Sequence, residues 1–135
     1  ITIIYVFCIL WDKYSIYTLW TGYDRWGANL WVEEMKSNGF TMEEVIQGAK
    51  TMSNPMKKLA CELDAKNINY NNNPILKWCL TNTQVKTDIN DNIQPVKGTN
   101  NKQRIDGTVS LIDAFVVLQN HYDDYITMTN MEGEV

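Results

Sequence analysis

The alternation of strand-like and helix-like segments in the first half of the chain restricts its fold more than any other feature. Ile16–Gly22 is short, aromatic and β-branched, as buried strands are, and Ala28–Ser37 has the apolar spacing of a helix. A second strand is predicted at Thr41–Gln47, and Ser53 can cap a helix that ends near Ala65. The order β-α-β-α predicts an α/β fold in which helices pack on a sheet.

Weaker patterns flank this unit. Ile1–Tyr14 has an apolar spacing that favours a helix, although its β-branched start also allows a strand. Pro74 follows an asparagine-rich turn and opens a short helix that ends at Leu80. Thr83–Thr87 and Ile93–Val96 flank a segment rich in Asp and Asn, and this composition predicts a β-hairpin.

The strongest helical pattern runs from Ile105 to about His121. Its apolar side chains recur at intervals of three and four along one stripe, formed by Ile105, Val109, Ile112 and Val116. The chain after Asp123 is polar, and we expect residues 123–135 to fray. The 135 residues suffice for one hydrophobic core and are too few for two, so we expect a single domain over residues 1–135.

The acidic balance of the chain excludes one class of nucleic-acid-binding protein. A net charge of −4 argues against coating nucleic acid through bulk positive charge, but it suits a site whose carboxylates hold divalent cations. The three cysteines are far apart, which indicates reduced core residues of an intracellular protein. The apolar N-terminal segment is too short to span a bilayer, so we expect no membrane contact.

Positive charge is concentrated in one part of the sequence. Four basic residues lie between the predicted short helix and the last one, namely Lys86, Lys97, Lys102 and Arg104. They are candidates for contacts to DNA phosphates. The alternative is that a charged hairpin is simply solvated, which is the commoner case.

Two aspartates occupy positions where a binding site can form. Asp24 follows the end of a predicted buried strand, where open α/β sheets place their ligands, although an isolated aspartate in a loop more commonly shapes a turn or caps a helix. Asp106 lies in the first turn of the last helix, where the helix dipole alone would stabilise it. Gly107 and Ser110 leave room beside it for a metal ion or a phosphate. Two carboxylates from separate elements are the pattern that metal-dependent nucleases need.

Other chemistry has less support. Asp113 lies two turns beyond Asp106, about 10 Å along the helix axis, so both cannot hold one ion, and we assign Asp113 a supporting role. The single histidine, His121, is expected to be a surface or capping residue. No glycine-rich phosphate loop indicates an ATPase, and no Ser or Cys has a recognisable general-base partner.

Three stretches of the chain together resemble the large terminase subunits of tailed phages and prophages. They are GYDRWGANLWVEEMKSNGF (22–40), NNPILKWCLTNTQVKTDINDNIQPVKG (72–98) and KQRIDGTVSLIDAF (102–115), and the resemblance runs from about Tyr5 to about Tyr122. It implies a ribonuclease H-like nuclease domain, with a mixed sheet flanked by helices. It also implies an endonuclease that cuts concatemeric double-stranded DNA during packaging, with Mg²⁺ or Mn²⁺, in the cytoplasm of a bacterial host.

The resemblance assigns roles to individual residues. Asp24 of YDRW and Asp106 of RIDG match two of the family's catalytic, metal-binding acids. In the family, an ATPase motor and the first strands of the nuclease domain precede this stretch, and the first strand supplies a further aspartate. Asp12 ends a predicted helix and therefore does not match that aspartate. We expect a partial domain that lacks the first strands and that could be inert alone.

Two other functions remain open. The chain could be a catalytically inactive terminase fragment that only binds DNA or docks to packaging partners, which in the family are the small subunit and the portal. It could also be another ribonuclease H-like nuclease, such as a resolvase or transposase, but these share the acids without the NPILKW and hairpin segments. A sheet edge left exposed by absent strands could promote self-association.

Overall fold

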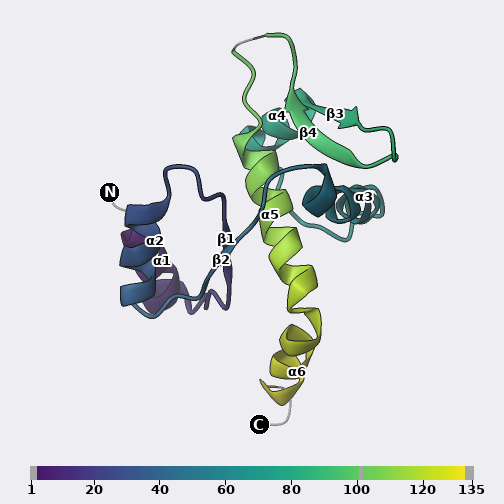
Figure 1. Cartoon of the computed structure of the whole chain (residues 1–135). Helices are drawn as coiled ribbons and strands as arrows, with labels where there is room; N and C mark the ends of the chain where they lie inside the picture. Colours follow the sequence, from purple (N-terminus) through teal and green to yellow (C-terminus); the bar gives the residue numbers. More distant parts are fainter. Residues whose placement is uncertain (1–2, 101, 133–135) are drawn as a thin grey trace.

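The computed structural model of the protein describes residues 3–100 and 102–132. Its α/β arrangement centres on one long helix, α5, with the other elements on either side (Figure 1). The elements in chain order are α1 (Ile3–Tyr14), β1 (Thr21–Tyr23), α2 (Asn29–Ser37), β2 (Met42–Glu44), α3 (Ala49–Asp64), α4 (Pro74–Asn82), β3 (Thr83–Thr87), β4 (Ile93–Lys97), α5 (Asp106–Asn120) and α6 (Tyr122–Glu132). No helix among the described residues has both the length and the apolar character needed to cross a membrane.

The first half of the chain forms the predicted strand–helix–strand unit. β1 and β2 pair in parallel, with Thr21 opposite Met42 and Tyr23 opposite Glu44, and α2 connects them. β1 packs against α5, whereas α2 packs against β2 and α1. The parallel strand pair therefore lies between α5 and the two helices α1 and α2 (Figure 1).

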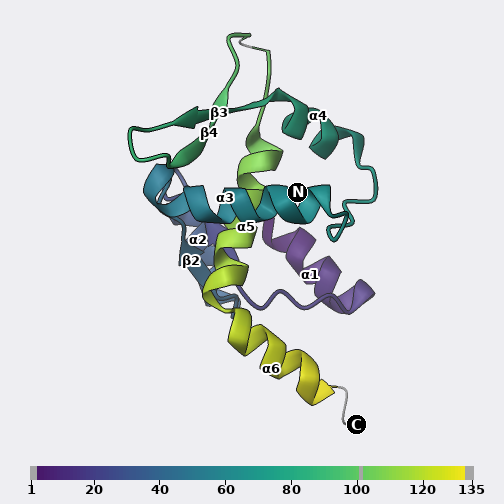
Figure 2. The same cartoon turned by 90° about the vertical axis from the view of Figure 1, so that its right-hand side faces the viewer.

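The second half of the chain supplies the rest of the core. β3 and β4 form the predicted antiparallel hairpin, with Thr83 opposite Lys97 and Thr87 opposite Ile93. The hairpin and α3 pack on each other, and α3 crosses α5 (Figure 2). The main buried cluster is formed by Val45, Met52, Met56, Leu59, Ile112, Val116 and Val117. Three members of the predicted α5 stripe are buried and Val109 packs against this cluster, so the stripe is confirmed.

Helix α3 begins five residues before the position predicted for it, with Gly48 and not Ser53 at its cap position. Ser53 does not cap the helix; it lies inside α3 and its Oγ accepts a hydrogen bond from the Ile93 N–H at 3.0 Å. Pro55 also lies inside the helix, where its missing N–H removes one backbone hydrogen bond. The helix persists because Pro55 and its neighbours Met52 and Met56 are buried, and this tertiary packing outweighs the local cost.

The two parallel strands are shorter than predicted. The sequence suggested strands over Ile16–Gly22 and Thr41–Gln47, but the ladder contains only Thr21–Tyr23, which ends one residue past the first prediction, and Met42–Glu44. A strand requires a partner as well as a suitable composition, and β2 is the only partner of β1 among the described residues. The segment before β1 therefore lies outside the sheet despite its aromatic and β-branched side chains.

The C-terminal segment is helical where the sequence predicted a frayed tail after Asp123. The His121 ring at the end of α5 stacks on Trp20, with centroids 4.5 Å apart, and its Nε2 lies 2.5 Å from Glu43 Oε2. Asn120 Nδ2 donates to the other oxygen of Glu43 at 2.7 Å. These contacts tie the end of α5 to β2, and α6 then starts with acids in its first turn, where the helix dipole favours them. Residues 133–135 of the predicted tail lie outside the described residues.

Candidate functional site

The first candidate acid, Asp24, lies where the two parallel strands end together. Asp24 follows the last residue of β1, and Gln47 lies three residues beyond the end of β2. Because the strands are parallel, both residues lie at the same edge of the pair, the position where α/β proteins bind ligands. Asp24 is half-buried, and its Oδ1 accepts a hydrogen bond from the Trp26 N–H at 3.2 Å, so it also shapes the turn.

Asp113 of α5 lies at the same edge. It is buried, and its Oδ1 accepts a hydrogen bond from Gln47 Nε2 at 3.1 Å. Burial raises the pKa of the Asp113 carboxyl; the hydrogen bond from Gln47 acts in the opposite direction, and the negative charge of Asp24 raises it further. Asp24, Gln47 and Asp113 therefore form one polar group, which we call the strand-end cluster.

The second candidate acid, Asp106, is not part of this cluster. It is exposed in the first turn of α5 and lines a different hollow from Asp24, beside Asn73 and Trp78 of the α4 region. Along α5 it lies two turns, about 10 Å, from Asp113. The structure thus brings Asp24 together with Asp113, to which the sequence had given only a supporting role.

Gly107, directly after Asp106, lies close against α4 on one side. A side chain at Gly107 would meet Cys79 Sγ at 3.2 Å and Leu76 Cδ1 at 3.4 Å. The glycine therefore permits α4 to pack closely on α5, and the open space beside Asp106 is the hollow that Asp106 and Gly107 line together with α4. Of the three cysteines, only Cys79 is buried, whereas Cys61 is exposed, so the prediction of three core cysteines is wrong.

The donors at these positions have the right chemistry for a hard divalent cation but do not complete a site. Carboxylate and amide oxygens are the ligands that Mg²⁺ and Mn²⁺ accept. Among residues 3–100 and 102–132, however, no three His, Cys, Asp or Glu side chains are placed to hold one metal ion. The described residues alone therefore do not complete a metal site.

The four basic candidates are all exposed but do not share one surface. Opposite residues of a hairpin share a face and adjacent residues alternate, so Lys97, opposite Thr83, and Lys86, opposite Gln94, point to opposite faces. Lys102 and Arg104 lie in the segment that leads into α5, close in sequence to Asp106. The structure therefore separates the hairpin lysines from each other, whereas Arg104 lines the same hollow as the second acid.

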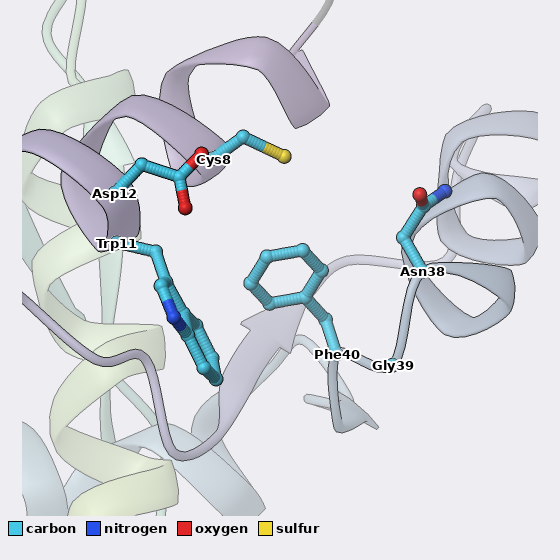
Figure 3. Close-up of a pocket in the computed structure, with 6 residues that line it drawn as sticks. All are labelled: Cys8, Trp11, Asp12, Asn38, Gly39 and Phe40. Carbon is cyan, nitrogen blue, oxygen red and sulfur yellow. The ribbon is translucent and has the colours of Figure 1, made fainter.

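Asp12, the only acid upstream of Asp24, lies elsewhere. It lines a hollow between α1 and the turn after α2, and Figure 3 shows it beside Cys8 on α1 with Asn38 across the hollow. Trp11 and Phe40 also line it, with their rings edge to face and their centroids 6.4 Å apart. This hollow shares no lining residue with those of Asp24 and Asp106.

Sequence reasoning did not identify Gln47. The rule that placed Asp24 at the carboxyl end of a strand applies equally to the end of the predicted second strand, where Gln47 is the last residue. The partnership with Asp113 was harder to anticipate, because it depends on how closely β1 approaches α5. A side chain at Gly22 would lie 2.8 Å from Val117 Cγ2 and 3.0 Å from the Asp113 carbonyl oxygen.

Comparison with known proteins identifies the fold and the family. The crystal structure of the HK97 bacteriophage large terminase superposes with a TM-score of 0.68 at 21% identity, over 84% of this chain and 24% of that one. The likeness shows the fold class, and it confirms the predicted α/β, ribonuclease H-like fold of a terminase nuclease. Residues 6–122 match the family model "Terminase large subunit, endonuclease domain", and the chain belongs to this family.

A similar protein from Escherichia coli is much longer than this chain. Protein YmfN of Escherichia coli (strain K12) is 32% identical over 93 residues, which are 67% of this chain and 20% of YmfN. The chain therefore spans about a fifth of this relative and about a quarter of the HK97 terminase.

Proposed function

We propose that the chain is the endonuclease module of a phage or prophage packaging terminase and that it takes part in cutting concatemeric double-stranded DNA. The observation that carries this proposal is the position of Asp24, which lies at the carboxyl ends of two parallel strands and beside an acid of α5 in a chain of the terminase endonuclease family. As a DNA-packaging module, it would act in the bacterial cytoplasm.

In this proposal Asp24 and Asp106 are the catalytic acids and supply carboxylate ligands to Mg²⁺ or Mn²⁺. Bound metal ions would activate water and stabilise the phosphate during cleavage. Because Asp106 lies about 10 Å along α5 from the strand-end cluster, one ion cannot bind both ends, and further ligands are needed between them. Asp113 acts as a positioning residue, since it holds Gln47 at the strand ends through a hydrogen bond of 3.1 Å.

Contacts to the DNA backbone follow from the distribution of basic residues. We expect Lys102 and Arg104 to contribute more than Lys86 and Lys97, because they lead into the helix that carries Asp106. The two hairpin lysines point to opposite faces, so one duplex cannot use both on a single face. Substitution of Lys102 by Ala should therefore weaken DNA binding more than substitution of Lys86.

A second function is favoured by one specific observation. The described residues hold no group of three His, Cys, Asp or Glu side chains placed around one metal ion. The chain could therefore be inactive by itself and serve as a DNA-binding or docking domain, with the terminase small subunit and the portal as partners.

Cleavage of supercoiled plasmid in Mn²⁺ separates the two functions. The samples are the wild-type chain with and without EDTA, Asp24→Asn, Asp106→Asn, and Asp91→Asn as a control for the loss of one charge. Asp91 is a suitable control because its side chain is exposed and its φ of 59° suits asparagine as well as aspartate. Circular dichroism of each variant establishes that it is folded.

The proposal predicts metal-dependent nicking that both site variants lose and the control keeps. Nicking that survives either site substitution would overturn the assignment of that acid. A folded wild-type chain without any nicking would support the second function.

A further inference from the structure

The junction between α4 and the start of α5 contains a hollow that the proposed chemistry does not explain. Figure 1 shows α4 lying against the N-terminal end of α5. The hollow is lined by Tyr70, Asn73, Ile75, Leu76, Trp78, Cys79, Arg104, Asp106 and Gly107. It therefore combines aromatic rings, an aliphatic wall, one guanidinium and one carboxylate.

Two aromatic side chains line this hollow, one from α4 and one from the loop before it. Trp78 belongs to α4 and is 46% exposed, although it is large and apolar, and Tyr70 precedes α4 and is half-buried. Ile75, on the first turn of the same helix, is 71% exposed. Exposed aromatic rings in a hollow provide flat apolar faces on which another planar ring can stack.

The polar groups of the hollow suit a ligand that carries a phosphate and a hydrogen-bonding ring, as a nucleotide does. Arg104 can pair with a phosphate or stack on a base, and its guanidinium cannot lose its charge near neutral pH. The first N–H groups of α5 have no side-chain cap, because Ile105 occupies the cap position, and such groups favour a nearby anion. Asp106 is unfavourable beside a bare phosphate, but its oxygens can accept hydrogen bonds from an exocyclic amino group of a base.

We propose that this hollow binds one unstacked nucleotide of the DNA, with the base on Trp78 and Tyr70. The inference rests on the proposed function, since it places that nucleotide beside the acid Asp106. In an intact duplex both faces of each base are covered by neighbouring bases, so only an unpaired or flipped-out base can reach these rings. The hollow should therefore favour single-stranded or frayed DNA over a blunt duplex.

Binding of labelled DNA in EDTA, followed by fluorescence anisotropy, tests the inference. The two ligands are a short single-stranded oligonucleotide and a blunt duplex. Trp78→Leu keeps an apolar side chain but removes the ring face, and it should weaken single-strand binding roughly tenfold or more while changing duplex binding less than about twofold. Trp78→Phe restores a ring and should recover most of the affinity. Tyr14→Leu on α1, where Tyr14 is 57% exposed, is the control for loss of an exposed ring and should change neither.

The outcomes distinguish this inference from the proposed function. An equal loss on both ligands, or no loss on either, overturns the nucleotide site and leaves the endonuclease proposal intact. A lower melting temperature of Trp78→Leu with unchanged binding would assign the residue to packing and also overturn the site. A wild-type chain that binds neither ligand would overturn both the site and the proposed DNA contacts. If Trp78→Leu does not fold, Tyr70→Leu provides the same comparison.

Discussion

At the carboxyl ends of the parallel strands, Asp113 keeps a carboxyl group where little water reaches it. It is only 6% exposed, and the amide of Gln47 donates to one of its oxygens. Burial disfavours the charged form, and the nearby Asp24 adds to this effect, so the pKa of Asp113 is raised. The folded protein therefore binds this proton more tightly than the unfolded chain does.

The raised pKa of Asp113 gives a prediction with a definite sign. Protonated Asp113 stabilises the folded protein relative to the unfolded chain. This stabilisation is fully present below the unfolded pKa of about 3.9 and is lost as the pH rises through the higher pKa of the folded protein. Asp113→Asn imitates the neutral form and still accepts the hydrogen bond from Gln47. We expect it to stabilise the protein by on the order of 1 kcal/mol at neutral pH, with a difference that shrinks as the pH falls. Thermal unfolding of both proteins over a pH series measures this, with Asp91→Asn as the control. A variant that is less stable at every pH would contradict the prediction.

Gly22 gives a second prediction at the scale of a single residue. A Cβ there would lie 2.8 Å from Val117 Cγ2 and 3.0 Å from the Asp113 carbonyl oxygen, closer than packed atoms allow. Gly22→Ala should destabilise the protein by about 1–3 kcal/mol, because β1 must move away from α5. Urea unfolding of Gly22→Ala, Val117→Ala and the double variant tests the cause. If the two substitutions are simply additive, the contact with Val117 is not responsible.

At the scale of elements, the β3–β4 hairpin is held by its own turn and by α3. The Asn92 side chain, and then the backbone N–H groups of Asn92 and Asn90, donate to Asp88 and keep the pKa of its carboxyl below the ordinary value. The turn should therefore be best ordered above the acid range and loosen as Asp88 is protonated. From α3, Lys57 Nζ donates to the Asp91 carbonyl at 2.9 Å.

The hydrogen bond between Ser53 and the hairpin can be tested by mutation. Ser53→Ala removes the acceptor of the Ile93 N–H and leaves a partly buried donor without a partner, at a cost of about 1–3 kcal/mol. Lys57→Ala removes an exposed contact to the same hairpin and should cost less than about 1 kcal/mol. Equilibrium unfolding gives both values, and amide exchange of β4 should rise in the first variant. Equal costs for the two substitutions would show that burial does not distinguish these hydrogen bonds.

Helices and strands could be predicted where their sequence signals come from residues that are neighbours along the chain. The helix α5, the hairpin and the helix α4 follow from apolar spacing, turn composition and a proline in the first helical turn. The start of α3 and the length of β1 could not be predicted from local patterns. Pro55 is tolerated inside α3 because of packing, and the length of a strand depends on its partner. In the same way Asp24 could be identified by its strand-end position, whereas Gln47 and Asp113 meet only after folding.

At the scale of the whole molecule, β1 leaves one edge unpaired among the described residues. A hollow lined by Phe7, Leu10, residues 17–22, Ser110, Ala114, Val117, Leu118 and Tyr125 runs beside this edge. An unpaired edge next to apolar side chains can bind another strand or a second copy of the chain.

We expect the chain to self-associate through this unpaired edge of β1. We expect the isolated chain to dimerise with increasing concentration and Leu19→Glu to remain monomeric, because the added charge would be buried in the contact. Leu30→Glu is the matched control, since Leu30 on α2 is 90% exposed and does not line this hollow. Light scattering during size exclusion measures the mass of each protein. If Leu30→Glu is the variant that stays monomeric, the contact lies on α2 and not on the β1 edge.

The sequence by itself determined the features that depend on neighbouring residues. Apolar spacing and turn residues specify the α/β order of elements, and the position of Asp24 after a strand marks a binding edge. The tertiary structure alone decided which side chains share a site. Gly22 lets β1 approach α5 so closely that Asp113 joins Asp24 and Gln47, while the helix rise keeps Asp106 two turns away. These relations join residues far apart in sequence, and only the packing of β1, the loop after β2 and α5 brings them together.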